Sequence, residues 1–238
     1  MHLLSIESST KNFALAVSKD GKVLRCRNMK AGKVLENSII PAIDRILLSA
    51  QVPFKKLDAF AVGLGPGSFT SLRVGLSTVK AFAMATGKPI AGICSLDVIA
   101  QGAAHVSCDE ICVIVDARRN LLYSALYQNT AGGAQRKGDY QLTDLKTVLE
   151  HVHGRTLFVG DGIPLYRKEI DCSYKECAHK NKTSCTALFA PEKFWFPQAS
   201  YLAKLGFQKI ARGQGDDAGK LLPMYLYAHD CQVSRNAK

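Results

Sequence analysis

The sequence has little of several features that would place it in a specialised class of protein. Its 238 residues include one tryptophan, no Cys-x-x-Cys pair, and no apolar run near the ~20 residues that span a bilayer. No basic segment opens the chain, and Glu7 and Lys11 interrupt its first apolar residues, so no signal peptide is expected. Hydrophobic content of 47% and charged content of 21% exclude a disordered or fibrous chain. We expect a soluble, cytoplasmic protein.

Acidic residues are scarce relative to basic ones. The chain has 20 Asp and Glu against 31 Lys and Arg, a formal net charge of +11. This balance favours an anionic partner, because Lys and Arg near a phosphate backbone release condensed counterions. A stand-alone RNA-binding module is therefore one alternative. In the second half the basic residues suit either a solvated face or non-specific phosphate contacts. They are Arg118, Arg119, Arg136, Lys137, Arg167, Lys168, Lys175, Lys180 and Lys182.

The eight cysteines follow no recognisable pairing pattern. In a chain without a signal peptide we expect reduced thiols, several of them buried. The cluster Cys172, Cys177, His179 and Cys185 contains residue types that bind metals. Its spacings of five, two and six match no usual zinc pattern. We predict no metal site there.

Hydrophobic periodicity predicts strands and helices in an order that partly repeats. Helices are expected from Leu35 to about Ser49, from about Ser71 to Thr86, and from Thr143–Asp144 to about His151. Predicted strands in the first half are 3–7, 12–18, 22–27, 59–64 and 90–94. Predicted strands in the second half are 111–116, 121–127, 136–141 and 156–160. This repetition implies a duplicated α/β unit with a mixed sheet in each copy.

Such a duplication predicts the two-lobed actin-like ATPase architecture (ASKHA, ribonuclease H-like), in which nucleotide sits in the cleft between the lobes. We expect an N-terminal lobe at residues 1–103 and a C-terminal lobe at residues 104–197. A C-terminal helix and tail, residues 198–238, are expected to pack across both lobes.

The most specific stretch is GLGPGSFTSLRVG at residues 63–75. Gly65 and Gly67 allow a tight turn after a buried strand, and Pro66 fixes φ between them. Backbone N–H groups of residues 68–70 then face outward at a helix N-terminus, where either an anion binds or a side chain caps the helix.

This stretch closely resembles the signature of the TsaB (YeaZ) family, and four further segments match that family in the same order. They are IESSTKNFALAVSKDGKV at 6–23, VDARRNLLYSALY at 115–127, FVGDGIPLY at 158–166 and LLPMYLYAHD at 221–230. The resemblance spans nearly the whole chain. Within the signature, Ser71 stands where the family usually shows glycine.

The resemblance implies a non-catalytic subunit for N6-threonylcarbamoyladenosine (t6A) modification of tRNA. Such proteins bind and stabilise the ATPase TsaD, which transfers the threonylcarbamoyl group, through helices of the N-terminal lobe. The small ATPase TsaE joins the pair, the protein alone forms a homodimer, and the basic second lobe is a candidate for tRNA contact. Interface residues are expected on two helices, part of each set packing on its own sheet. They are Ile39, Ile43, Ile46, Leu47, Leu72, Gly75, Leu76 and Val79.

On this interpretation, Gly75→Arg is expected to abolish the heterodimer while leaving the fold intact. The small side chains of Ser71, Gly75 and Thr78 share one side of the second helix, so a neighbouring helix can approach closely there.

Three local observations agree with a non-catalytic role. The first phosphate-binding turn falls at 7–10 and has no glycine, and Ala117–Arg119 stand where TsaD has a glycine pair. The two metal-ligating histidines of TsaD align with Ser95 and Ile99, and isoleucine cannot bind a metal. The nearest candidate for an adenosine-binding motif, 160–162, is interpreted as a plain turn. We predict no catalytic residue, cofactor or metal site.

Glu7 and Asp116 keep an enzymatic alternative open. Both end buried strands and would point toward the cleft, where paired carboxylates bind Mg²⁺ or act as acid and base. An active ATPase or phosphotransferase would use Glu7, Thr10 and Asp116. Otherwise each acid accepts hydrogen bonds from nearby loop amides. No Ser-His-Asp or Cys-His set occurs in a recognisable order.

Overall fold

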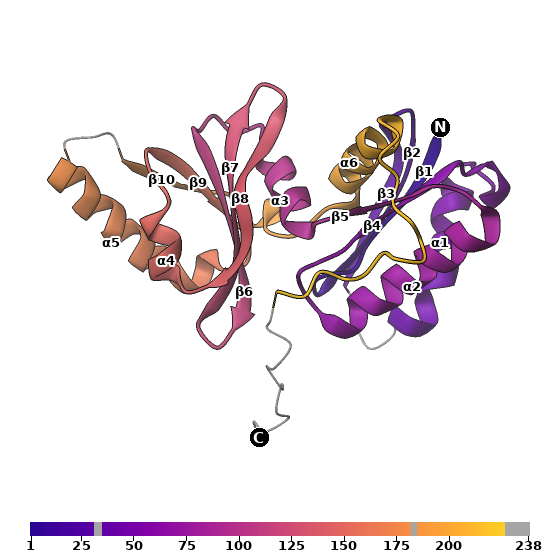
Figure 1. The fold of residues 1–238 in the computed structure, drawn as a ribbon, viewed down its shortest axis with the longest axis horizontal. Helices are drawn as coiled ribbons and strands as arrows, with labels where there is room; N and C mark the ends of the chain where they lie inside the picture. Colours follow the sequence, from indigo (N-terminus) through magenta and orange to yellow (C-terminus); the bar gives the residue numbers. More distant parts are fainter. Residues whose placement is uncertain (31–34, 182–184, 227–238) are drawn as a thin grey trace, which may run out of the picture.

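A computed structural model describes residues 1–30, 35–181 and 185–226, which form two α/β lobes side by side (Figure 1). The first elements are β1 (His2–Glu7), β2 (Asn12–Lys19), β3 (Lys22–Lys30), α1 (Leu35–Ser49), η1 (Phe54–Lys56), β4 (Ala59–Gly63), α2 (Phe69–Thr86) and β5 (Ile90–Ile93). The next are α3 (Ser95–Ala103), β6 (Glu110–Arg118), β7 (Leu121–Thr130), β8 (Gly133–Thr143), α4 (Leu145–Glu150), β9 (Arg155–Val159), α5 (Ile163–Asn181) and β10 (Thr186–Phe189). The last are η2 (Glu192–Phe194) and α6 (Ala199–Ala211).

Each lobe is built on a five-stranded mixed sheet of the same topology. The first sheet has the order β3-β2-β1-β4-β5, and the second has the order β10-β9-β6-β7-β8. In both, the first three strands of the lobe pair antiparallel, and the last two add in parallel beside the first strand. The predicted duplication and the α/β fold class are thus confirmed.

Helices cover both faces of each sheet, because the central strands are buried on both sides. In the first lobe, α1 and α2 pack on one face and α6 packs on the other (Figure 1). In the second lobe, α4 and α5 cover one face, and α3 covers the other. Within the described ranges, no helix combines the length and the apolar character needed to cross a membrane.

The C-terminal part contacts both lobes. Helix α6 packs on the first sheet and also contacts α3, where Val98 joins its cluster and a Cβ at Gly102 would lie 3.2 Å from the Tyr201 ring. Leu221 packs against the core of the first lobe, and Met224 and Leu226 pack against the core of the second. Residues 227–238 of the expected tail lie outside the described residues.

Helix α3 packs in the core of the second lobe, although the expected boundary at residue 103 assigns it to the first. Its Asp97 carboxylate accepts hydrogen bonds from the hydroxyls of Tyr127 (2.8 Å) and Tyr140 (2.7 Å). Burial raises the pKa of both tyrosines, which keeps the two hydroxyls protonated as donors. Because Val98 packs in the first-lobe cluster and Ser95 bonds Glu7 of β1, α3 contacts both lobes, and the division into domains stays a proposal.

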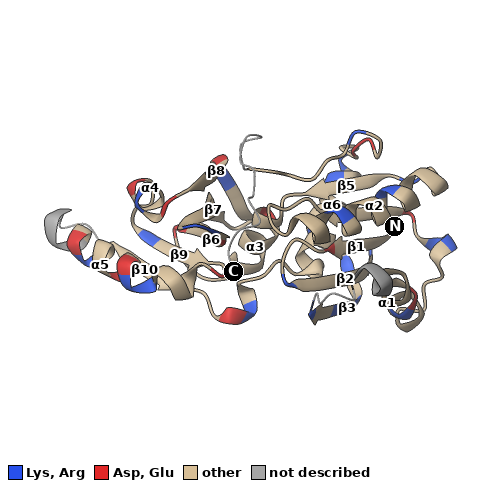
Figure 2. Ribbon diagram, turned by 90° about the horizontal axis from the view of Figure 1, so that it is seen from below, with Lys and Arg blue, Asp and Glu red and all other residues tan. Residues whose placement is uncertain are grey.

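Charged side chains are spread over the whole molecule. Figure 2 shows Lys and Arg on both lobes, interspersed with Asp and Glu. Among the second-lobe cations singled out in the sequence, Lys137 Nζ lies 2.6 Å from Glu110 Oε1, and the Arg136 guanidinium lies over the Tyr140 ring. These contacts favour the solvated-face interpretation at those two positions.

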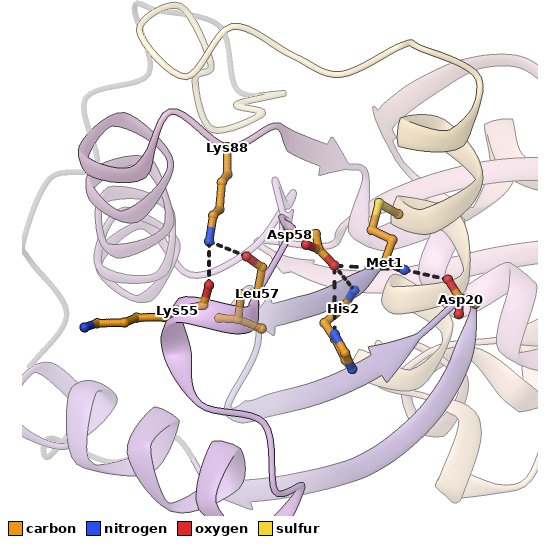
Figure 3. A network of polar contacts seen from close by, with 7 residues as sticks. All are labelled: Met1, His2, Asp20, Lys55, Leu57, Asp58 and Lys88. Atoms are coloured by element: carbon orange, nitrogen blue, oxygen red, sulfur yellow. Dashed lines mark hydrogen bonds and ion pairs between the residues drawn. The ribbon is translucent and has the colours of Figure 1, made fainter.

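A polar network fastens the first sheet at the N-terminal end of β1 (Figure 3). The α-amino group of Met1 donates to Asp20 Oδ1 at 2.5 Å and lies 3.9 Å from Asp58 Oδ2. Nearby, Lys88 Nζ donates to the carbonyl oxygen of Leu57. The carboxyl end of β1, which leads to the cleft, lies at the opposite end of the strand. We therefore interpret the network as structural.

Candidate functional site

The side chains expected at the partner interface point into the core of the first lobe. None of the seven apolar ones is more than 4% exposed, and Gly75 is buried as well. They are Ile39, Ile43, Ile46, Leu47, Leu72, Gly75, Leu76 and Val79. The most apolar stripe of an amphipathic helix packs on its own sheet, so these residues face inward. The structure corrects the choice of side chains, while the choice of helices remains a proposal.

Gly75 lies where α2 closely approaches the turn that follows β1. A Cβ atom at this position would lie 2.2 Å from Ser8 Oγ and 3.1 Å from Ser8 Cβ. The glycine thus makes room for the Ser8 turn of the same lobe, and its Cα faces inward rather than toward a partner helix. Gly75→Arg would drive a long side chain into this contact, so the expectation that it leaves the fold intact is wrong.

The outward sides of α1 and α2 carry large exposed apolar side chains. Ile40 and Leu48 of α1 are 46% and 81% exposed, and Phe69 and Met84 of α2 are 51% and 66% exposed. Exposed small side chains between the two on α2 are Ser77 and Ala81. We call these six residues the α1–α2 face. Hydrophobic periodicity does not select these six residues. They could be found in the sequence as apolar or small side chains at helix positions outside the inward stripe.

A cleft of about 520 Å³ lies between the lobes and is the second candidate site. Ser9, Lys11, Asp116, Asp161 and Trp195 are among the residues that line it. Each lobe contributes the turn that follows its first strand. These two turns occupy the positions where an ATPase of this architecture would hold phosphates.

The two turns use their backbone donors internally and in the same way. Ser9 N–H donates to Glu7 Oε1 at 2.8 Å, and Arg118 N–H donates to Asp116 Oδ1 at 2.8 Å. Each acid therefore accepts a hydrogen bond from the amide two residues later, which confirms the loop-amide interpretation of both. One N–H group of each turn, that of Ser9 and that of Arg118, is therefore already bonded within the turn.

Glu7 lies beneath its turn instead of facing the cleft. Its carboxylate is fully buried and accepts a second hydrogen bond from Ser95 Oγ at 3.0 Å, and burial raises the pKa of Glu7. Gly65 N–H in turn donates to Ser95 Oγ at 3.2 Å. A Cβ at Gly63 would lie 2.1 Å from Glu7 Oε2, so only glycine fits there. Glu7 thus joins β1 to α3 and does not form a carboxylate pair with Asp116.

The turn after β6 presents side chains where a phosphate would approach. Arg118, Arg119 and Asn120 all have left-handed backbones, with φ of 70°, 55° and 60°. Asp116 N–H donates to Asp161 Oδ1 at 3.1 Å, and burial raises the pKa of Asp161, with the charge of Asp116 adding to the rise. Two adjacent carboxylates and the Arg118 side chain therefore line this end of the cleft. Carboxylates at this position repel an anion, whereas the guanidinium attracts one.

Metal-ligand geometry does not occur among the residues that the structure describes: no three His, Cys, Asp or Glu side chains converge. Ser95 is bonded to Glu7, and Ile99 is 2% exposed in the second-lobe core, so neither replaces a histidine ligand of TsaD. In the cysteine cluster, the Sγ atoms of Cys177 and Cys185 are 2.8 Å apart. The side chain of His179 lies outside the described residues.

Two copies of one mixed sheet, helices on both faces and a cleft between the copies define the two-lobed actin-like ATPase class of fold. The ROK hexokinase from Thermus thermophilus is similar to this chain in fold alone. Its TM-score is 0.52 at 10% identity, covering 90% of this chain and 100% of that one.

Within this class, the family model described as TsaD: tRNA N6-adenosine threonylcarbamoyltransferase matches residues 29–209. The chain therefore belongs to this family. The tRNA threonylcarbamoyladenosine biosynthesis protein TsaB from Bacillus subtilis (strain 168) is 26% identical over 229 residues, covering 95% of this chain and 94% of the relative. The uncharacterized protein ML0378 from Mycobacterium leprae (strain TN) is 41% identical over 91 residues. That match covers 38% of this chain and only 24% of the relative.

A solved structure with similarity to YEAZ has the same fold as this chain. It is the crystal structure of an uncharacterized protein with similarity to peptidase YEAZ from Pseudomonas aeruginosa. The TM-score is 0.77 at 24% identity, and the match covers 95% of this chain and 99% of that one. The resemblance to TsaB (YeaZ) proteins that the sequence motifs indicate is thereby confirmed.

Proposed function

We propose that this chain is a non-catalytic subunit in the biosynthesis of tRNA N6-threonylcarbamoyladenosine, where it binds and stabilises a TsaD-like ATPase-transferase. The family model and the names of the TsaB relatives support a role in this biosynthesis. The proposal includes a ternary complex with a TsaE-like ATPase, and a homodimer when the partner is lacking. It places the complex in the cytoplasm, with tRNA contacted only within the complex.

The observation that carries the proposal is the concentration of exposed apolar side chains on one part of the molecule. Eight large hydrophobic residues are exposed in the described chain, and six lie on α1, α2 or the segment beside α2. These six are Ile40, Leu48, Phe69, Met84, Leu222 and Tyr225. Extended apolar surface of this kind is uncommon on monomers and marks a surface for another protein. Helices with small residues between large ones suit a close helix–helix contact.

Charged substitutions on the α1–α2 face test this proposal. Leu48→Asp and Met84→Asp each place a carboxylate where the interface would exclude water, and an unpaired buried charge is costly. Isothermal titration with the purified TsaD-like protein should show an affinity loss of about tenfold or more for each variant. The matched control is Leu165→Asp on α5, where leucine is 58% exposed on the other lobe. Wild-type affinity of both first-lobe variants would refute the proposal.

The cleft supports the non-catalytic part of the proposal, because one N–H group of each turn, that of Ser9 and that of Arg118, is bonded to an acid of the same turn. We expect the isolated chain to release phosphate from ATP and Mg²⁺ no faster than a protein-free control. An ATPase or phosphotransferase would instead show turnover that Asp116→Asn abolishes. A stand-alone RNA-binding module would bind tRNA without a protein partner, with an affinity that falls steeply as salt rises.

A further inference from the structure

Residues 219–226, which we call the strap, lie along the outward side of α2 (Figure 1). Lys80 Nζ donates to the carbonyl oxygen of Leu221 at 2.9 Å. The Tyr225 ring packs on the Phe69 ring, with centroids 5.3 Å apart. The strap therefore runs antiparallel to α2 and covers about three turns of it.

The strap is held by both lobes. Leu221 packs against the first-lobe core, and Met224 and Leu226 pack against the second-lobe core. Met224 N–H donates to the carbonyl oxygen of Leu64 at 2.8 Å. Lifting the strap from α2 would expose apolar surface of two cores to water, which opposes its displacement by a partner.

A groove of about 780 Å³ lies between α2 and the strap. Met84 on one wall is 66% exposed, and Leu222 on the other is 71% exposed. Within the part of the chain that the structure describes, no side chain covers these apolar walls fully. Further apolar lining residues are Leu76, Ala81, Leu221 and Pro223.

The charged residues that line the groove are two cations, Arg73 and Lys80. Arg73 Nε donates to the Tyr225 hydroxyl at 3.2 Å, and Lys80 Nζ donates to two backbone carbonyls, so both cations donate to neutral acceptors. In the parts of the chain that the structure describes, neither cation has a carboxylate within ion-pair distance. Two positive charges beside apolar walls are complementary to a ligand that combines apolar side chains with carboxylates.

We propose that this groove receives one edge of a helix from the TsaD-like partner. Apolar side chains of that helix enter between α2 and the strap, and a carboxylate on its flank pairs with Arg73 or Lys80. An apolar groove with charges on one side is a common receptor for amphipathic helices. The inference rests on the proposed function and extends the α1–α2 face by the strap, with Leu222 as a contact residue.

Titration of the purified TsaD-like protein against three variants tests the groove. Leu222→Asp charges the strap wall, and the double variant Arg73→Glu/Lys80→Glu reverses the cations. Each should lower the affinity about tenfold or more. Rising salt should weaken wild-type binding, and it should weaken binding of the double variant less. The control Lys146→Glu/Lys168→Glu makes the same change of charge on the second lobe and should stay within about twofold of wild type.

The outcomes separate this inference from the proposed function. Wild-type affinity of both groove variants, together with loss of binding by Leu48→Asp, overturns the groove and leaves the proposed function standing. Wild-type affinity of both groove variants and of Leu48→Asp overturns the groove inference and the proposed function together. Groove variants that lose only self-association in sedimentation, or only tRNA binding, assign the groove to a second copy or to RNA and overturn the inference. Because Lys80 also anchors the strap, Leu222→Asp decides if the two groove variants disagree.

Discussion

Ser95→Ala should destabilise the protein through two buried groups that the serine hydroxyl joins. Ser95 is 1% exposed at the start of α3. Its Oγ donates to the buried Glu7 carboxylate at 3.0 Å and accepts from Gly65 N–H at 3.2 Å. Alanine keeps the helix and the packing but removes both hydrogen bonds. We predict a loss of roughly 2–5 kcal/mol in the free energy of unfolding.

The magnitude follows from the groups left without a partner. A buried donor or acceptor that loses its hydrogen bond costs about 1–3 kcal/mol, and a charged group costs more. Gly65 N–H and one carboxylate oxygen of Glu7 together account for roughly 2–5 kcal/mol. In a chain of this size about 1 kcal/mol shifts the melting temperature by about 2–4 °C. The melting temperature should therefore fall by roughly 4–20 °C.

Urea unfolding followed by circular dichroism measures the loss, with thermal scans as the second readout. The matched control is Ser107→Ala, since Ser107 is exposed and the same change there should stay within about 0.5 kcal/mol. A Ser95→Ala variant as stable as this control would refute the interpretation of Glu7 as a structural tie. The carboxylate would then be held by other groups, and its role would have to be sought elsewhere.

Three further changes test other parts of the structure. Burial raises the pKa of Glu7 above its ordinary 4.5, so ionising it opposes folding. The free energy of unfolding of wild type, measured relative to Glu7→Gln, should therefore be constant below about pH 4.5 and fall as the pH rises through the folded pKa. Urea unfolding that shows this difference rising with pH would contradict the prediction. Arg119→Gly relieves a left-handed backbone with φ of 55° and should raise the melting temperature by roughly 2–4 °C. Leu202→Ala on α6, where leucine is fully buried, should cost about 2–5 kcal/mol by calorimetry; an unchanged melting temperature would contradict the packing of α6 on the first sheet.

Elements with a strong local signal are predictable from the sequence. The helix expected from Leu35 to about Ser49 has those bounds in the structure, because its apolar spacing is regular and turn residues follow it. Asp144, expected as a helix cap, accepts a hydrogen bond from Thr147 N–H at 2.8 Å. Each of these features depends on residues a few positions apart, so local rules are sufficient.

Elements that depend on distant neighbours are missed. Helix α5 is mostly polar, and its fully inward side chains, Ile163, Ile170 and Tyr174, are too widely spaced to form a continuous stripe. Strand β10 has four residues and joins the sheet only through its pairing with β9. The role of Ser95 is also invisible locally, because its acceptor Glu7 is 88 residues away in the chain. Only the tertiary structure shows this helix, this strand and this hydrogen bond.

The same limit explains why apolar periodicity in α1 and α2 selects buried side chains instead of exposed ones. The helices of both lobes bury an apolar stripe against their sheet. The strongest apolar periodicity therefore marks side chains that stabilise the fold, which the two copies share. A partner surface consists of what remains outside that stripe. There the copies differ: α1 and α2 expose Ile40, Leu48, Phe69 and Met84, whereas the described parts of α4 and α5 expose Leu165 as their large apolar side chain. Duplication of a sheet therefore does not duplicate a binding face, and the outward residues of one copy are where partner binding should be sought.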